Sequence, residues 1–119
     1  MKKKIFLIPL KNIKKKKIFI YQKNVFNIQR LYFHQDLKKG YIFGSHAHRY
    51  SRQIFMCILG SVKISVLLNN KKKIYILNNP LKALHIGSGI WKQIETLSNN
   101  SILCSLSNKK FDKNDYIYK

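Results

Sequence analysis

The chain has 119 residues, and its 24 Lys and Arg against four Asp and Glu give a formal net charge of +20. A content of 45% hydrophobic and 13% aromatic residues excludes a disordered polycation, and the length suits one domain with a buried core. The excess charge is mostly Lys, whereas nucleic-acid-binding modules rely on Arg to read phosphates and base edges, so a nucleic-acid partner is disfavoured.

The N-terminus combines basic residues with a short apolar run, residues 5–8, that ends at Pro9. This run is too short for a signal peptide, and no stretch reaches the roughly 18 to 20 apolar residues of a membrane span. Cys57 and Cys104 lie within strand-like runs without a partner at metal spacing, which indicates free thiols in a reducing compartment. We therefore expect a soluble, cytoplasmic protein without membrane association.

Short β-branched and aromatic runs with a period of two alternate along the chain with Asn, Gly and Pro. In "SVKISVLL", for example, Val62, Ile64 and Val66 share one face, and the Asn69-Asn70 pair after it suits a tight hairpin. The pattern predicts an all-β sandwich or closed barrel, as one domain over residues 1–119. The predicted strands span residues 5–8, 17–21, 27–35, 46–59, 61–68, 72–77, 83–86, 91–97 and 102–107.

The stretch "GSHAHRYSRQ", residues 44–53, carries two histidines one residue apart. Side chains two apart on a strand project from the same face, about 6.5 Å from each other, so His46 and His48 are predicted to line one wall. The spacing from Gly40 through His46, His48 and Gln53 to Gly60 resembles the first cupin motif, with Gln53 in place of the usual glutamate. This resemblance implies a double-stranded β-helix, or jelly-roll, barrel.

Longer segments narrow the resemblance. "VFNIQRLYFHQD", "GSHAHRYSRQIFMCILGSVKISV", "HIGSGIWKQIETLSNNSILCSLS" and "FDKNDYIYK" are similar to the dTDP-sugar 3,4-ketoisomerase branch of the cupins, over about residues 25–119. The resemblance implies isomerisation of dTDP-4-keto-6-deoxyglucose to a dTDP-3-keto-6-deoxyhexose, for deoxyamino-sugar and cell-surface glycan biosynthesis such as that of lipopolysaccharide. It also implies a homodimer that exchanges strands.

A metal centre is not expected. An ordinary cupin centre uses both histidines of the first motif, its glutamate and a histidine of the second motif. In this sequence Lys92 occupies the position of the second-motif histidine, and a protonated ammonium cannot bind a cation, while Gln53 offers only a neutral amide. The sequence therefore predicts neither a metal nor any other cofactor.

Proton transfer is the chemistry that the histidine pair favours. The isomerisation removes the C3 proton, which the neighbouring carbonyl makes acidic, and returns a proton to C4 through an enediol. An imidazole gains and loses protons near neutral pH, so His46 and His48 are the predicted acid and base. The resemblance places the catalytic tyrosine at Tyr32, whose phenol is the predicted donor to the developing oxyanion.

Three further residues are candidates for substrate binding. Trp91 lies in the second-motif turn, Arg49 belongs to the "HAHR" element, and Gln53 holds the position of the motif's glutamate. Regular alternation points Arg49 away from the histidines, and Gln53 joins their face only if a bulge intervenes. His34 and His85 have no motif support and are expected to serve packing.

The sequence departs from the family pattern at several positions. Phe43 replaces an arginine, Gly87-Ser88 replaces a Pro-Pro turn, and Lys92-Gln93 stands where a His-Glu pair is usual. These departures leave open a cupin that binds sugar nucleotides without catalysis, as well as the less favoured basic nucleic-acid-binding module.

Overall fold

The computed structural model describes residues 4–13, 18–22 and 25–118. Strands dominate these ranges, which confirms the all-β prediction. No helix in them is long and apolar enough to cross a membrane. The elements are β1 (Ile5–Pro9), β2 (Lys11–Ile13), β3 (Ile18–Ile20), β4 (Arg30–Leu37), β5 (Ile42–His48), β6 (Gln53–Leu59), β7 (Val62–Leu68), β8 (Lys71–Leu77), β9 (Lys82–Ile86), β10 (Trp91–Thr96), β11 (Ser101–Ser107), the 3-10 turn η1 (Lys113–Asp115) and β12 (Tyr116–Ile117).

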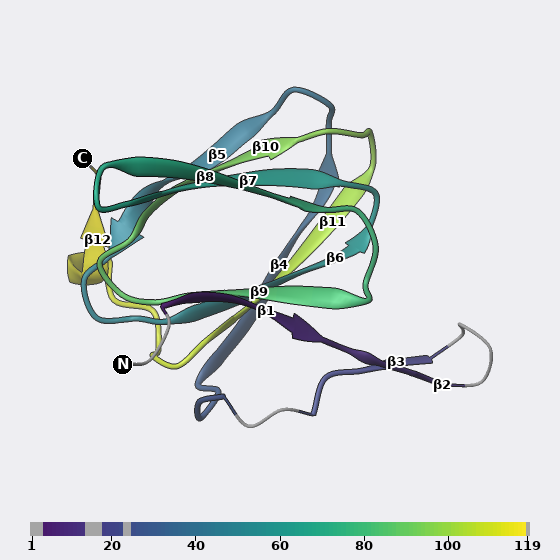
Figure 1. Ribbon diagram of the computed structural model, residues 1–119, viewed down its shortest axis with the longest axis horizontal. Coiled ribbons are helices and arrows are strands. Elements are labelled where there is room, and N and C mark those ends of the chain that lie inside the picture. The colour runs from purple at the N-terminus through teal and green to yellow at the C-terminus, as the bar shows by residue number, and fades with distance from the viewer. Residues whose placement is uncertain (1–3, 14–17, 23–24, 119) are drawn as a thin grey trace.

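Two antiparallel five-stranded sheets face each other (Figure 1), with strand orders β1-β9-β6-β11-β4 and β12-β5-β10-β7-β8. Strands β4 to β11 alternate between the sheets in the order of a jelly roll, with β7 and β8 paired as a hairpin in one sheet. The cupin-like double-stranded β-helix prediction is therefore confirmed. The apolar side chains between the sheets form the main core, and they include Phe55, Ile64, Leu84, Ile94 and Leu103.

The β7–β8 hairpin follows the predicted pattern. Val62, Ile64 and Val66 are buried between the sheets. Asn69 and Asn70 connect the strands with φ of 53° and 62°, the left-handed backbone of a two-residue type I′ turn. Local turn chemistry therefore sets the register of this pair.

The single strand predicted over residues 46–59 is wrong. Strand β5 ends at His48 and β6 begins at Gln53, and the two strands lie in opposite sheets. Residues 49–52 cross between the sheets because the Asp115 carboxylate accepts hydrogen bonds from the backbone N–H groups of Tyr50 (2.5 Å) and Ser51 (3.2 Å). These amides are satisfied by a side chain, so they need no partner strand.

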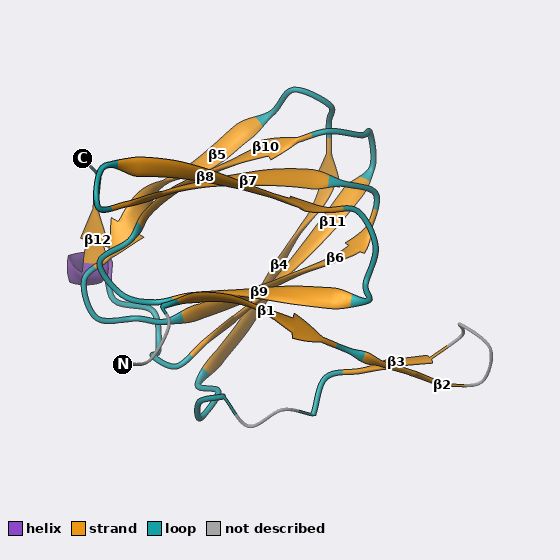
Figure 2. Cartoon of the chain, viewed as in Figure 1, coloured by secondary structure: helices purple, strands orange, loops and turns teal. Residues whose placement is uncertain are grey.

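The N-terminal part of the chain adds a covering strand and an arm. Strand β1 extends the first sheet beside β9, and the sequence after it forms the β2–β3 hairpin, which projects away from the body (Figure 2). Strands β2 and β12 were not predicted. The strand predicted over residues 17–21 corresponds to β3, with its first residue, Lys17, outside the described residues.

Candidate active site

A pocket of about 190 Å³ lies between the two sheets. It is lined by Tyr32, His34, Phe43, Gly44, His46, Phe55, Lys92, Ile94 and Tyr116. Two predicted catalytic residues, Tyr32 and His46, therefore meet here from opposite sheets. A larger hollow of about 460 Å³ near β8 is lined by no histidine, cysteine or acidic residue.

A bulge in β5 allows its residues to share the pocket. His46 pairs with Lys92 and Phe43 pairs with Ile94, so β5 holds one residue more than β10 between these pairs. Gly44 adopts a φ of +68° in this bulge, which L side chains rarely reach. The extra residue shifts the alternation, and Phe43 faces the pocket together with His46.

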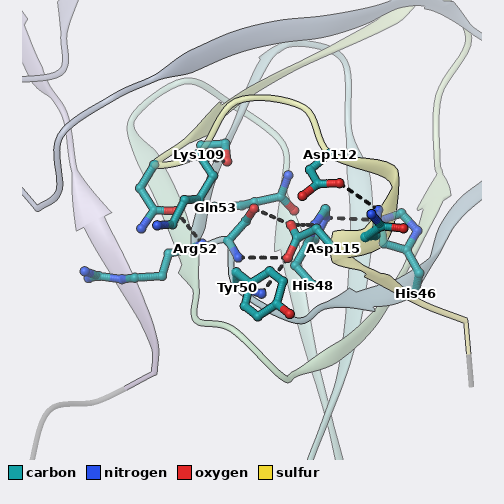
Figure 3. Close-up of polar contacts among 12 residues, drawn as sticks. His46, His48, Tyr50, Arg52, Gln53, Lys109, Asp112 and Asp115 are labelled. Carbon is teal, nitrogen blue, oxygen red and sulfur yellow. Dashed lines mark hydrogen bonds and ion pairs between the residues drawn. The ribbon is translucent and has the colours of Figure 1, made fainter.

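The two histidines and a carboxylate form a continuous hydrogen-bonded chain (Figure 3). Nε2 of His46 lies 3.2 Å from Nε2 of His48, and Nδ1 of His48 lies 2.9 Å from Oδ2 of Asp115. An ionised carboxylate only accepts hydrogen bonds, so His48 donates from Nδ1 and accepts at Nε2 from His46. In this arrangement Nδ1 of His46 keeps a free lone pair for a substrate proton.

Asp115 belongs to the candidate site through this chain of hydrogen bonds, and the sequence did not single it out. Its carboxylate also accepts a hydrogen bond from the Ser51 hydroxyl, besides the two backbone N–H groups of the crossing segment. Burial would raise the pKa of Asp115, but the hydrogen bonds from Ser51, Tyr50 and His48 outweigh it and lower the pKa to about 2. The only sequence signal was its place in the segment "FDKNDYIYK", far from the histidines along the chain.

Both imidazoles are neutral at neutral pH. Burial, and then the positive charge of Lys92, lower the pKa of His46 to about 3 and lower the pKa of His48 as well. The charge of Asp115 acts in the opposite direction on both. A neutral imidazole is the form that accepts a proton, and its lowered pKa makes His46 a weaker base than a free imidazole.

Tyr32 and Gln53 form a second polar contact inside the barrel. Nε2 of Gln53 donates a hydrogen bond of 2.6 Å to the Tyr32 hydroxyl. Gln53 is buried and starts β6, so it faces the interior because a new strand begins there, and not because of a bulge. Burial raises the pKa of Tyr32, so its phenol stays protonated and keeps its proton for another acceptor.

Lys92 points into the same interior from β10 and is only 3% exposed. Its ammonium lies 5.6 Å from the centroid of the Phe55 ring. Burial lowers the pKa of Lys92 to about 7, against the attraction of Asp115. Throughout residues 4–13, 18–22 and 25–118, no three His, Cys, Asp or Glu side chains are grouped so that they could hold a metal ion.

Two predicted binding residues lie outside the pocket. Trp91 pairs with Leu67 and therefore faces outward, on the opposite side of β10 from Lys92. Arg49 is exposed beyond the end of β5. A role for either residue in substrate binding stays a prediction.

The other two histidines have different surroundings. His34 lines the pocket beside Phe43, with a ring-centroid distance of 4.6 Å. His85 stacks on Phe6 at 4.3 Å and accepts a hydrogen bond from Nε of Arg52, so it serves packing as expected.

Arg30, at the start of β4, is a cation that the sequence did not single out. Its guanidinium carbon lies 5.1 Å from the Tyr32 ring centroid and 5.8 Å from that of Phe111. Its Nε is buried without a hydrogen-bond partner among the described residues. A buried donor of this kind is available to an anion that binds beside Tyr32.

Comparison with known proteins gives consistent matches. Residues 2–119 match the model of a protein family described as FdtA: WxcM-like, C-terminal. The TDP-4-oxo-6-deoxy-alpha-D-glucose-3,4-oxoisomerase of Aneurinibacillus thermoaerophilus is 29% identical over 96 residues, which cover 80% of this chain and 69% of that protein.

Solved structures agree in fold. QdtA, a sugar 3,4-ketoisomerase from Thermoanaerobacterium thermosaccharolyticum in complex with TDP, matches with a TM-score of 0.90 and 28% identity over 100% of this chain and 90% of that chain. A histidine-to-asparagine mutant of QdtA, in complex with TDP-4-keto-6-deoxyglucose, matches with the same values. WlaRA, a TDP-fucose-3,4-ketoisomerase from Campylobacter jejuni, matches with a TM-score of 0.87 and 34% identity over 97% of this chain and 89% of that chain.

Proposed function

The chain belongs to the family described as FdtA: WxcM-like, C-terminal, and from this premise we propose that it is a 3,4-ketoisomerase of TDP-linked 4-keto-6-deoxy sugars. The observation that carries this function is the chain of hydrogen bonds from His46 through His48 to Asp115 at a pocket shared with Tyr32. Its product is a TDP-3-keto-6-deoxyhexose, which serves deoxyamino-sugar and cell-surface glycan biosynthesis. The enzyme acts in the cytoplasm without a membrane or nucleic-acid partner.

The geometry supports a proton shuttle along one wall of the pocket. His46 takes the C3 proton on Nδ1, and its Nε2 proton can pass to His48, where the adjacent Asp115 carboxylate stabilises the imidazolium. Return of the proton to C4, only about 1.5 Å from C3, needs no large movement. Tyr32 donates a hydrogen bond to a sugar oxygen, so charge that develops there is stabilised.

The nucleotide part of the substrate needs a cation for its diphosphate. Arg30 offers a guanidinium beside Tyr32, and its buried Nε has no partner within the described chain. A guanidinium binds phosphate oxygens in a bidentate manner, which favours Arg30 over the exposed Arg49.

A homodimer is part of this proposal. Strand β4 is the edge of its sheet, and its outward side chains Leu31 and Phe33 are 61% and 58% exposed. The β2–β3 hairpin projects from the body where a second copy could receive it (Figure 1). An apolar sheet edge and a projecting hairpin are both stabilised by pairing between copies.

Incubation with TDP-4-keto-6-deoxyglucose in deuterated water tests the function. We expect a 3-keto product with deuterium at the sugar ring, detected by nuclear magnetic resonance, and loss of turnover with retained TDP binding in His48→Asn. Calorimetric binding of TDP without turnover or deuterium uptake would instead identify a non-catalytic sugar-nucleotide binder. Salt-dependent binding to any polyanion, without preference for TDP, would identify a nucleic-acid-binding module.

A further inference from the structure

Lys92 is a buried cation that forms no ion pair with any of the described residues. It lies directly opposite His46 in the antiparallel pair of β10 and β5, and it lines the same pocket. Among the described residues, Glu95 pairs with Lys63 and Asp115 is hydrogen-bonded to His48, so no carboxylate pairs directly with the Lys92 ammonium. Burial of a charged group without such a pair costs desolvation free energy, and the Lys92 ammonium is buried at the pocket.

Packing does not explain a lysine at this position. The contact with the Phe55 ring is a cation–π interaction of modest strength, and a methionine of similar length would fill the same space without a charge. A lysine is therefore required only if its ammonium interacts with something that enters the pocket.

The charges around Lys92 shift the pKa values of the residues at the pocket wall. Burial, and then the positive charge of Lys92, lower the pKa values of the two histidines, while the charge of Asp115 favours the charged form of Lys92. A charged Lys92 therefore adds to the effect of burial on His46, and the pair places an acid and a base side by side. The titratable groups that face the ammonium or line the same pocket are His46 and His48 on β5, Asp115 on η1, Tyr32 and His34 on β4, and Tyr116 on β12.

We propose, on the basis of the ketoisomerase function above, that Lys92 is a further catalytic residue, which protonates the carbonyl oxygen at C4 while His46 removes the proton from C3. The C3–H electron pair forms the C3=C4 bond, and the carbonyl π pair takes the Lys92 proton to give an O4–H bond. The amine of Lys92 then accepts the proton of the C3 hydroxyl, C3=O forms, and His46 returns its proton to C4. Both residues end in their starting states, and no further reactant is needed.

Three variants test this role kinetically. Lys92→Met should bind TDP as the unmodified protein does and melt no lower, but its kcat should fall 100-fold or more, because the developing oxyanion loses its donor. The kcat of the unmodified protein should fall as pH rises through about 7, and Lys92→Arg should move that decline to higher pH. Lys72→Met, at an exposed lysine of β8, is the matched control and should change nothing.

A kcat of Lys92→Met within threefold of the unmodified protein overturns the proposal. So does a mass increase at Lys92 after borohydride reduction with substrate, because it would show covalent attack by the amine instead of proton donation.

A spectroscopic measurement separates this proposal from the ketoisomerase function. With TDP-4-keto-6-deoxyglucose labelled with carbon-13 at C4, bound to His46→Gln to block turnover, the carbonyl resonance should move downfield. The shift should disappear in His46→Gln/Lys92→Met. An identical resonance in both proteins overturns the role of Lys92, whether or not the unmodified protein turns the sugar over.

Discussion

Nδ1 of His48 lies 2.9 Å from Oδ2 of Asp115, although the two residues are 67 positions apart along the chain. The same carboxylate accepts the backbone N–H groups of Tyr50 and Ser51, which hold the crossing segment after β5. One side chain therefore fixes both the tautomer of the His48 imidazole and the path of the chain between the sheets.

Asp115→Asn should impair both catalysis and stability, whereas the same change at an exposed acid should impair neither. Its amide can donate toward Nδ1 and favour the wrong tautomer of His48, so kcat should fall by about 100-fold or more. Loss of the charge on an acceptor of four hydrogen bonds should also lower the free energy of unfolding by about 1–3 kcal/mol, measured by urea denaturation.

Asp112→Asn is the control for this experiment. Asp112 is exposed and only caps η1 through the N–H of Asn114, which an asparagine side chain also accepts. Its kcat should not change. A kcat of Asp115→Asn within fivefold of the unmodified protein would contradict a role for Asp115 in the proton relay.

The bulge in β5 gives a second prediction. A Cβ on Gly44 would lie 3.3 Å from Cδ1 of Ile94, on a backbone with φ of +68°. Gly44→Ala should therefore cost about 1–2 kcal/mol of unfolding free energy and displace His46, with a fall of tenfold or more in kcat. Gly40→Ala, with φ of +90° and open space around the added Cβ, should show a similar loss of stability with unchanged kcat. Equal kcat values in both variants would argue against the bulge as the element that positions His46.

Stability should fall in mild acid. The pKa of His46 is about 3 and that of His85 about 4, both lowered first by burial, against an ordinary value of 6.5. Between these folded values and 6.5 the unfolded chain binds more protons, so the free energy of unfolding decreases as pH falls from about 6.5 toward 3. Urea midpoints at pH 7, 6, 5 and 4, repeated at high salt to screen charge repulsion, measure this slope. A flat profile would contradict the neutral state of these imidazoles.

The metal-free mechanism predicts insensitivity to chelation. Lys92 stands where the second-motif histidine of a metal-binding cupin is expected, beside His46. Dialysis against a strong chelator should leave kcat unchanged, and added Zn²⁺, Mn²⁺ or Ni²⁺ should not raise it. A loss of activity that one of these ions restores would show that the site requires a metal.

The sequence predicts those features of the fold and of the candidate site that depend on residues close to each other along the chain. The alternation in β7, the Asn69-Asn70 hairpin and the contact between the His46 and His48 rings all follow from neighbouring residues, although of these two histidines only His46 lines the pocket. The crossing after His48 does not, because its amides are satisfied by Asp115, whose position depends on the whole fold. The surroundings of Lys92 are equally non-local: its residue type is visible in the sequence, but only packing shows that it lines a pocket and has no carboxylate partner among the described residues.

Arg30 gives the last prediction, which concerns nucleotide binding. Arg30→Gln keeps much of the side-chain length but removes the positive charge beside Tyr32 and Phe111, so the Kd for TDP should rise tenfold or more. Arg49→Gln is the comparison, because Arg49 is exposed at the end of β5, and its effect should be smaller. Calorimetry at 50 and 200 mM salt measures both, and the salt dependence should weaken in Arg30→Gln because a phosphate contact is lost. A larger loss of affinity in Arg49→Gln would show that Arg49, and not Arg30, contacts the diphosphate, and it would place the nucleotide outside the cleft between the sheets.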